Sequence, residues 1–116
     1  MTADLDELII ELDGTLDDIL LADPPVDDLG VDYDDQGDVV LTEHGLHLQR
    51  CYGELCKLYA RFAERKVPGA TAICAILDTH LEPLANLDNW TFVNKLPEAA
   101  LALDHELNLY KWAVAA

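Results

Sequence analysis

Apolar residues recur every three or four positions over much of the chain, and this helical spacing is what most limits the fold. The chain has 116 residues, which is the size of one domain. We therefore predict that residues 1–116 form a single, mainly α domain with about four helices in a small bundle. Over residues 4–21 the recurring apolar positions are Leu5, Leu8, Ile9, Leu12, Leu16, Ile19 and Leu20.

The first two helices have recognisable ends. Asp4 begins the first one, with Glu7 three residues later as in a capping box, and the pattern continues to about Leu21. Gly14 lies inside this helix and is a point where it can bend or break. Thr42 caps a second helix that continues to about residue 66.

The remainder of the chain predicts two further helices. Residues 67–69, Val-Pro-Gly, form a turn before the third helix, and Pro83 weakens its end. Residues 90–93 are short and apolar, and we expect them to be extended. Pro97 suits the first turn of the last helix.

An Asp-rich segment separates the first two helices and is expected to be a loop. Within it, residues 31–33 and 39–41 can pair as one short β-hairpin. Trp90 and Trp112 are either core or interface residues. The expected core consists of Leu12, Leu16, Leu55, Tyr59, Phe62, Ile73, Ile76, Leu77, Leu107 and Tyr110.

Charge divides the chain into two parts. Residues 1–43 hold fifteen of the 23 acids and no Lys or Arg, whereas residues 44–116 hold the other eight acids and all seven bases. The net charge of −16 therefore belongs almost wholly to the acidic N-terminal helix and loop, and the helical core after residue 43 is near neutral. A halophilic protein would spread its acids over the whole surface, so this asymmetry indicates a local use.

We expect the acidic part to bind a basic surface on a partner protein. Between Asp4 and Asp18 seven carboxylates would occupy about 21 Å of helix, a spacing similar to that of charges along one DNA strand. The function predicted is that of an inhibitor or nucleic-acid mimic that occupies the basic surface of a nucleic-acid-binding protein. An acidic immunity-type protein that neutralises a basic toxin is an alternative. The predicted contact residues are Asp17, Asp18, Asp23, Asp27, Asp28, Asp32, Asp34 and Asp35.

A basic stripe on the second helix offers another contact. It points away from that helix's apolar face, so the acidic helix of a second copy could dock there and form a homodimer. Glu54 and Glu64 lie among these bases, and together with the net charge they argue against direct nucleic-acid binding. The stripe consists of Arg50, Lys57, Arg61 and Arg65.

Residues 32–43 resemble a twelve-residue EF-hand calcium loop, and calcium binding is a second alternative function. The resemblance implies that Gly37 makes the sharp turn at the sixth position, and two residues depart from it, Gln36 as the fifth ligand and Val40 at the ninth position. A β-hairpin turn rich in Asp explains the same residues, and we predict no tight metal site. The ligands implied are Asp32, Asp34, Gln36, Asp38 and Glu43.

His44, His47 and Cys51 follow one another along one flank of the second helix. They would suit zinc if Glu43 or another residue completed a tetrahedron. The alternative, which we favour, is a polar helix edge with one buried thiol. Cys51 could also combine with two other histidines, His80 and His105, in a thiol hydrolase, although lone histidines at the edge of a core are commoner.

Residues 11–16 resemble the first motif of haloacid dehalogenase-like phosphatases, Asp-x-Asp-Gly-Thr after a hydrophobic strand. In that family the first Asp is the nucleophile, and here Glu11 stands at that position and Asp13 at the second. The longer side chain of Glu11 would misplace the attacking oxygen. We therefore predict no catalytic residues, no cofactor and no enzymatic activity.

The remaining features concern the compartment. Acids stand where a signal peptide needs bases, and no apolar run approaches membrane-spanning length. The three cysteines are an odd number and do not form a disulfide framework. We expect a cytoplasmic protein that does not bind membranes.

Overall fold

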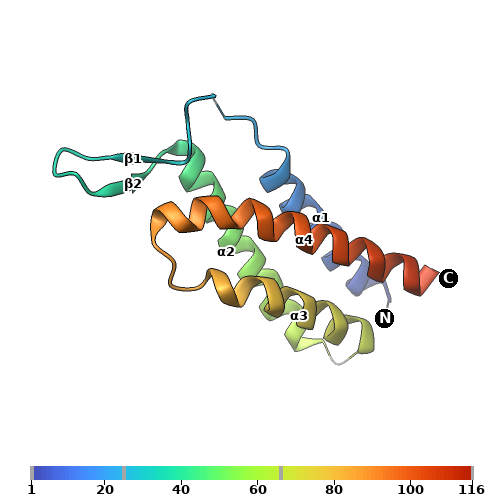
Figure 1. Cartoon of the computed structure of the whole chain (residues 1–116). Coiled ribbons are helices and arrows are strands. Elements are labelled where there is room, and N and C mark those ends of the chain that lie inside the picture. Colours follow the sequence, from blue (N-terminus) through green and yellow to red (C-terminus); the bar gives the residue numbers. More distant parts are fainter. Residues whose placement is uncertain (1, 25, 66, 116) are drawn as a thin grey trace.

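The computed structural model describes residues 2–24, 26–65 and 67–115 (Figure 1). Within these residues the chain forms four α-helices and one antiparallel two-stranded hairpin, which confirms the predicted mainly α bundle. The elements are α1 (Thr2–Leu20), β1 (Val31–Tyr33), β2 (Val39–Leu41), α2 (Glu43–Glu64), α3 (Pro68–Leu81), the 3-10 turn η1 (Glu82–Leu84) and α4 (Asn89–Ala115).

Helix α1 packs against α2 and α4 through one apolar face. Leu8, Leu12 and Leu16 are almost completely buried on this face. The helix runs without interruption through Gly14, so the break that we considered there does not occur. The burial of the neighbouring leucines outweighs the cost of one exposed glycine, which is about 1 kcal/mol.

The starts of α2 and α3 follow the sequence signals. Thr42 is the N-cap of α2, and its Oγ1 accepts a hydrogen bond from Gly45 N (3.2 Å). Helix α2 ends at Glu64, and Pro68 occupies the first turn of α3, where its missing N–H costs nothing. Helix α3 ends before Pro83, as predicted.

The structure corrects two expectations in the last helix. Residues 90–93 are helical and not extended, and Pro97 lies inside α4 instead of in its first turn. Asp88 precedes the helix, and its Oδ1 accepts a hydrogen bond from Thr91 N (2.7 Å) in the manner of a cap. Leu96 is fully buried beside the proline, so packing offsets the hydrogen bond that Pro97 cannot donate.

Seven of the ten predicted core residues are buried. The other three, Tyr59, Ile76 and Tyr110, are only partly buried and pack at the edge of the core. For the two tyrosines this position leaves the polar tip near solvent. The buried residues that the predicted core list did not include are Leu8, Ile19, Leu48, Cys51, Leu58, Ala70, Leu81, Leu84, Phe92, Val93, Leu96, Ala100 and Leu103.

The hairpin projects from one end of the bundle, and both chain termini lie at the opposite end (Figure 1). Its strands pair in the register Val31 with Leu41, Asp32 with Val40 and Tyr33 with Val39. Val31 and Leu41 pack against the core, which fixes the base of the hairpin on the bundle. The hairpin end also holds the beginning of α2 and the beginning of α4 (Figure 1).

Candidate partner-binding surface

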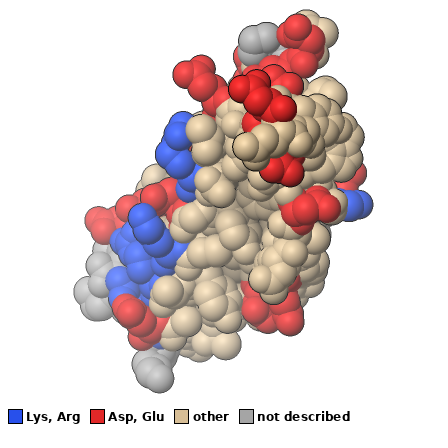
Figure 2. All heavy atoms as spheres, turned by 90° about the vertical axis from the view of Figure 1, so that its left-hand side faces the viewer, with Lys and Arg blue, Asp and Glu red and all other residues tan. Residues whose placement is uncertain are grey.

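The eight aspartates predicted to bind a partner lie in three consecutive pieces of the chain. Two are in the last turn of α1, three are between residues 21 and 30, and three are in the hairpin. Seven of the side chains are exposed, and Asp28 is half-buried. Figure 2 looks onto the hairpin end and shows acidic atoms over its upper part, while the larger group of basic atoms follows one flank. We call this set the acidic end: Asp17, Asp18, Asp23, Asp27, Asp28, Asp32, Asp34 and Asp35.

Asp28 differs from the other seven because its side chain connects two separate segments of the chain. Its Oδ1 accepts hydrogen bonds from Gly30 N (2.9 Å) and from Thr42 Oγ1 (2.8 Å). Thr42 N in turn donates to Gly30 O (3.0 Å). The hydrogen bonds from Gly30 and Thr42 lower the pKa of Asp28 because they stabilise its charged form. Asp28 therefore ties the loop after α1 to the N-terminus of α2, and this oxygen is already occupied.

The tip of the hairpin is also organised by a carboxylate. Asp34 Oδ1 accepts hydrogen bonds from Gln36 N and Asp38 N, both at 2.9 Å. Asp34 N donates to Asp38 O (2.9 Å), and Gly37 supplies the positive φ of 84° that the turn requires. These bonds fix the backbone of the tip, so that Asp35 is displayed on a defined turn.

The residues of the calcium-like loop are spread along this hairpin. Asp32 lies in β1 opposite Val40, and Glu43 is the first residue of α2. The carboxylate of Asp34 is turned to backbone N–H groups of its own turn. Within the described residues no three His, Cys, Asp or Glu side chains come together in a group that could hold a metal ion.

The acids of α1 and the acids that follow it differ in their cationic partners. Arg61 Nη1 on α2 lies 2.6 Å from Glu11 Oε2, and Lys111 on α4 pairs with Asp13. In the part of the chain that the structure describes, no Lys or Arg forms an ion pair with a carboxylate between residues 17 and 43. The bases after residue 43 thus offset charge on α1 and leave the acidic end negative.

The same ion pairs bear on the basic stripe of α2. Arg61 is engaged by α1 of its own chain, and Lys57 Nζ lies 3.2 Å from Glu54 Oε1. Arg65 is half-buried at the C-cap of α2. Part of the contact that we predicted between two copies is therefore made within one chain.

Large apolar side chains are exposed among the acids, and residue spacing does not predict this exposure. Residues 21–30 follow neither a helical nor a strand period, so the direction of their side chains cannot be deduced from spacing. Exposed apolar residues that gather on one surface are typical of binding sites. On and beside the acidic end they are Leu21 (76% exposed), Val26 (102%), Leu29 (64%), Tyr33 (67%), Val40 (38%) and Trp90 (47%).

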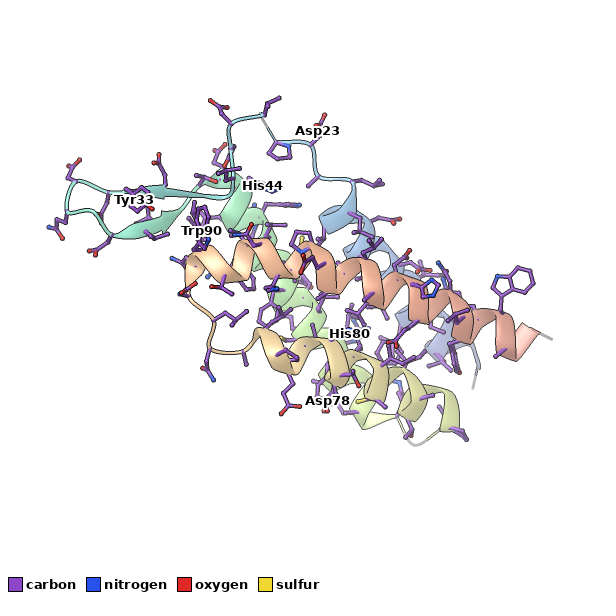
Figure 3. All side chains as sticks on the ribbon, in the orientation of Figure 1. Asp23, Tyr33, His44, Asp78, His80 and Trp90 are labelled. Atoms are coloured by element: carbon purple, nitrogen blue, oxygen red, sulfur yellow. The ribbon has the colours of Figure 1, made fainter. Side chains whose placement is uncertain are left out.

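The two tryptophans lie on the surface at opposite ends of α4. Trp90 is in its first turn, and Trp112, 22 positions later, is 78% exposed. At 1.5 Å per residue this separation is about 33 Å along the helix. Of the two, Trp90 therefore lies at the hairpin end (Figure 3).

Among the described residues, the histidine and cysteine candidates do not belong to any group of three His, Cys, Asp or Glu side chains that could hold a metal ion. His47 Nε2 lies 2.8 Å from Asp18 O, and since a carbonyl only accepts, this nitrogen carries a proton. Cys51 Sγ lies 3.7 Å from the same nitrogen, which therefore has no lone pair for the thiol. Burial, and after it the charge of Asp18, raises the pKa of Cys51, so its thiolate is disfavoured. Cys51 is buried on the flank of α2, as our preferred interpretation has it.

The two histidines invoked for a thiol hydrolase lie on different helices. His80 on α3 has its Nε2 2.6 Å from Glu106 Oε2 on α4, which gives this ring a partner other than Cys51. His105 is exposed on α4. His44 is half-buried in the first turn of α2. The structure thus gives Cys51 and His80 separate partners.

The phosphatase-like motif lies in a helix. Glu11, Asp13 and the residues before them all belong to α1, so the strand that precedes this motif in the phosphatases is not formed. Glu11 and Asp13 pair with Arg61 and Lys111 in the helix interface. Their positions are explained by the packing of α1 against α2 and α4.

Comparisons of the chain with protein families, with curated proteins and with solved structures found no match. Across the described residues, no helix combines the length and the apolar character needed to cross a membrane.

Proposed function

We propose that this protein binds a partner protein whose surface is basic and binds nucleic acid, and that it occupies this surface in place of the nucleic acid. The observation that carries the proposal is the acidic end. It presents seven exposed aspartates, and in the described residues none of them is paired with a Lys or Arg. Such a surface attracts a groove lined with bases, and the association is fast and sensitive to salt.

The scaffold under these charges supports the proposal. Asp28 fixes the loop to the N-cap of α2, and Asp34 fixes the tip of the hairpin. A surface held in place before binding loses less conformational entropy when the partner docks. Phosphates on a duplex are likewise held at fixed spacing, and the match between two rigid charge patterns favours binding.

The exposed apolar residues support a protein as the partner. Leu21, Val26 and Leu29 lie among the acids without burial in this chain. Contacts between proteins commonly combine a few apolar anchors with a polar rim, and burial of these anchors adds to affinity without any dependence on salt. We therefore expect binding to weaken with salt but to retain an apolar component.

The test uses two variants that change charge equally at two places. The first replaces four exposed acids of the acidic end that make no scaffold contact described above: Asp17→Asn, Asp23→Asn, Asp27→Asn and Asp35→Asn. The matched control replaces four exposed acids of the later part: Glu64→Gln, Asp78→Asn, Glu82→Gln and Glu98→Gln. Each protein is immobilised, incubated with nuclease-treated lysate of its host at low and moderate salt, and the captured proteins are identified by mass spectrometry.

The captured protein is then purified and titrated with duplex DNA. We expect wild type and the control variant to capture the partner and the first variant to lose it. We also expect duplex DNA to compete with wild type for the partner and to release the partner from the immobilised protein. A partner retained equally by both variants would refute a role for the acidic end. A partner that is lost by the first variant but does not bind nucleic acid would favour the immunity-type alternative over the mimic.

A further inference from the structure

Two exposed aromatic residues lie at the hairpin end, one on the hairpin and one at the start of α4, and we call the region between them the corner (Figure 3). Tyr33 stands opposite Val39 in the hairpin, and opposing residues of two antiparallel strands share one face. Asn89 Nδ2 donates to Val39 O (3.2 Å), which holds the first turn of α4, and with it Trp90, against the hairpin. Tyr33 is 67% exposed and Trp90 is 47% exposed.

The charges near this corner are negative. Asp32 precedes Tyr33 and its Oδ1 accepts from Tyr33 N (2.8 Å), and Asp88 caps the helix turn that carries Trp90. The hydrogen bonds from the Thr91 side chain and backbone lower the pKa of Asp88, which keeps it charged. The next base along α4 is Lys95, and its Nζ lies 3.6 Å from Glu98 Oε2.

Rings beside carboxylates select one kind of cationic side chain. A guanidinium group is planar, so it can stack on a ring face while its N–H groups donate to a carboxylate beside the ring. An ammonium group is a compact, strongly hydrated charge without a planar face, so it gains less than a guanidinium group from stacking on a ring. The exposed rings thus add a preference for arginine over lysine, which the negative charge alone does not provide.

We infer that the corner formed by Tyr33 and Trp90 binds arginine side chains of the partner, and that the partner's contact segment is rich in arginine rather than lysine. This inference rests on the proposed function, since the same acidic end must attract the segment. It adds the recognition of arginine by the two rings, which the charges of the acidic end do not require.

Two peptide probes of equal charge, nona-arginine and nona-lysine, test the inference by titration calorimetry. The variants are Tyr33→Leu and Trp90→Leu, which keep an apolar side chain but remove the ring. Trp112→Leu is the matched control, because Trp112 is exposed on the same helix but far from the hairpin. Thermal melts followed by circular dichroism establish that each variant is folded.

We expect wild type to bind nona-arginine more tightly than nona-lysine. Each ring removed at the corner should weaken nona-arginine binding about five-fold, as expected for one partly exposed cation–π contact. Nona-lysine binding should change much less, and the Trp112→Leu control should behave like wild type. Trp90→Phe should restore most of the preference for arginine.

Three results would overturn the inference. They are equal affinities for the two peptides, an equal loss of both peptides in the corner variants, or the same loss in the Trp112→Leu control. If these occur while both peptides still bind with steep salt dependence, the acidic end remains and only the arginine corner is refuted. If neither peptide binds, the proposed function itself fails.

Discussion

Helix α1 and the segment that follows it are almost equally acidic, yet the structure holds them in different ways. Residues 2–20 carry seven acids and residues 21–41 also carry seven, and neither contains a Lys or Arg. Helix α1 buries Leu8, Leu12, Leu16 and Ile19, whereas Gly30 is the one buried residue among those described in 21–41. The spacing of apolar residues, and not the charge, decides which acidic segment joins the core.

The two segments also differ in what happens to their charge. Two acids of α1 receive a base from α2 or α4, at Arg61 and Lys111. The acids described in the later segment take part in local hydrogen bonds, such as those of Asp28 and Asp34, or stand in solvent. Packing against the near-neutral part brings bases to α1, and a segment outside the bundle keeps its full charge.

The largest expected effect contrasts the core face of α1 with the hairpin. Leu16→Ala removes a fully buried side chain and should lower the free energy of unfolding by about 3 kcal/mol. Val40→Ala acts on a partly exposed strand residue and should cost less than about 0.5 kcal/mol. Urea unfolding followed by tryptophan fluorescence measures both, and similar losses would refute the division between a packed α1 and a displayed hairpin.

The next effect concerns the close contact between Gly30 and Gly45, where the acidic segment after α1 meets α2. We call this contact the joint. A Cβ at Gly45 would collide with the Gly30 carbonyl O, which is backbone and cannot move aside. Gly45→Ala should therefore cost about 2–3 kcal/mol, as overpacking does. Gly53 lies in the same helix with open space around it, so Gly53→Ala should instead stabilise by about 0.5–1 kcal/mol. The same urea titrations compare them, and a stabilising Gly45→Ala would show that the joint is loose.

Most of the fold could be predicted from the sequence because the apolar residues of an amphipathic helix recur every three or four positions. The leucines of α1, the Thr42 cap and the hairpin pairing are local signals, and the structure confirms them. The start of α4 was missed because Pro97 and a short apolar run suggested a later beginning. Tertiary packing of that face decided the outcome, and spacing alone could not weigh it.

The sequence predicted the negative charge of the candidate surface, but it did not predict which acids form ion pairs or hydrogen bonds within the fold. The pairs of Glu11 with Arg61 and Asp13 with Lys111 join residues far apart in the sequence, so no local pattern announces them. The role of Asp28 likewise depends on Thr42, fourteen positions later. The sequence could count the acids, but only the tertiary structure separates those that build the scaffold from those that are displayed.

A smaller effect is expected at the hydrogen bonds that Thr42 makes with Asp28 and Gly45, which we call the clamp. Thr42→Val removes the hydroxyl that donates to Asp28 and accepts from Gly45 N, and the loss should be about 1 kcal/mol, as for other N-caps. Folding lowers the pKa of Asp28, so its charged carboxylate stabilises the folded state. This contribution to the free energy of unfolding is fully present at pH values above the ordinary pKa of aspartate, and it is lost as the pH falls through the lowered pKa.

The stability difference between wild type and Asp28→Asn should therefore shrink between pH 6 and pH 3. Thermal melts across this range measure it, with Asp35→Asn as the matched exposed control. A difference that is constant with pH would show that the charge of Asp28 does not contribute to the clamp.

The smallest effects test whether bases of the later part stabilise α1 specifically. Arg61→Gln removes a partner of Glu11 from an exposed pair, and Lys111→Gln removes the partner of a more enclosed carboxylate, Asp13. We expect losses of a few tenths of a kcal/mol for the first and about 0.5–1 kcal/mol for the second, both reduced by added salt. Lys57→Gln removes a base that pairs within α2 and is the control.

Neutralising the displayed segment should have the opposite sign. Asp35→Asn lowers the repulsion among carboxylates that have no Lys or Arg partner among the described residues, so it should leave the free energy of unfolding unchanged or raise it slightly at low salt. If Asp35→Asn destabilises as much as Lys111→Gln, the acids of the hairpin serve the fold in the way those of α1 do. If the two signs differ and converge at high salt, α1 uses its charge within the molecule while the hairpin keeps its charge at some cost to stability, as expected of a surface selected for binding.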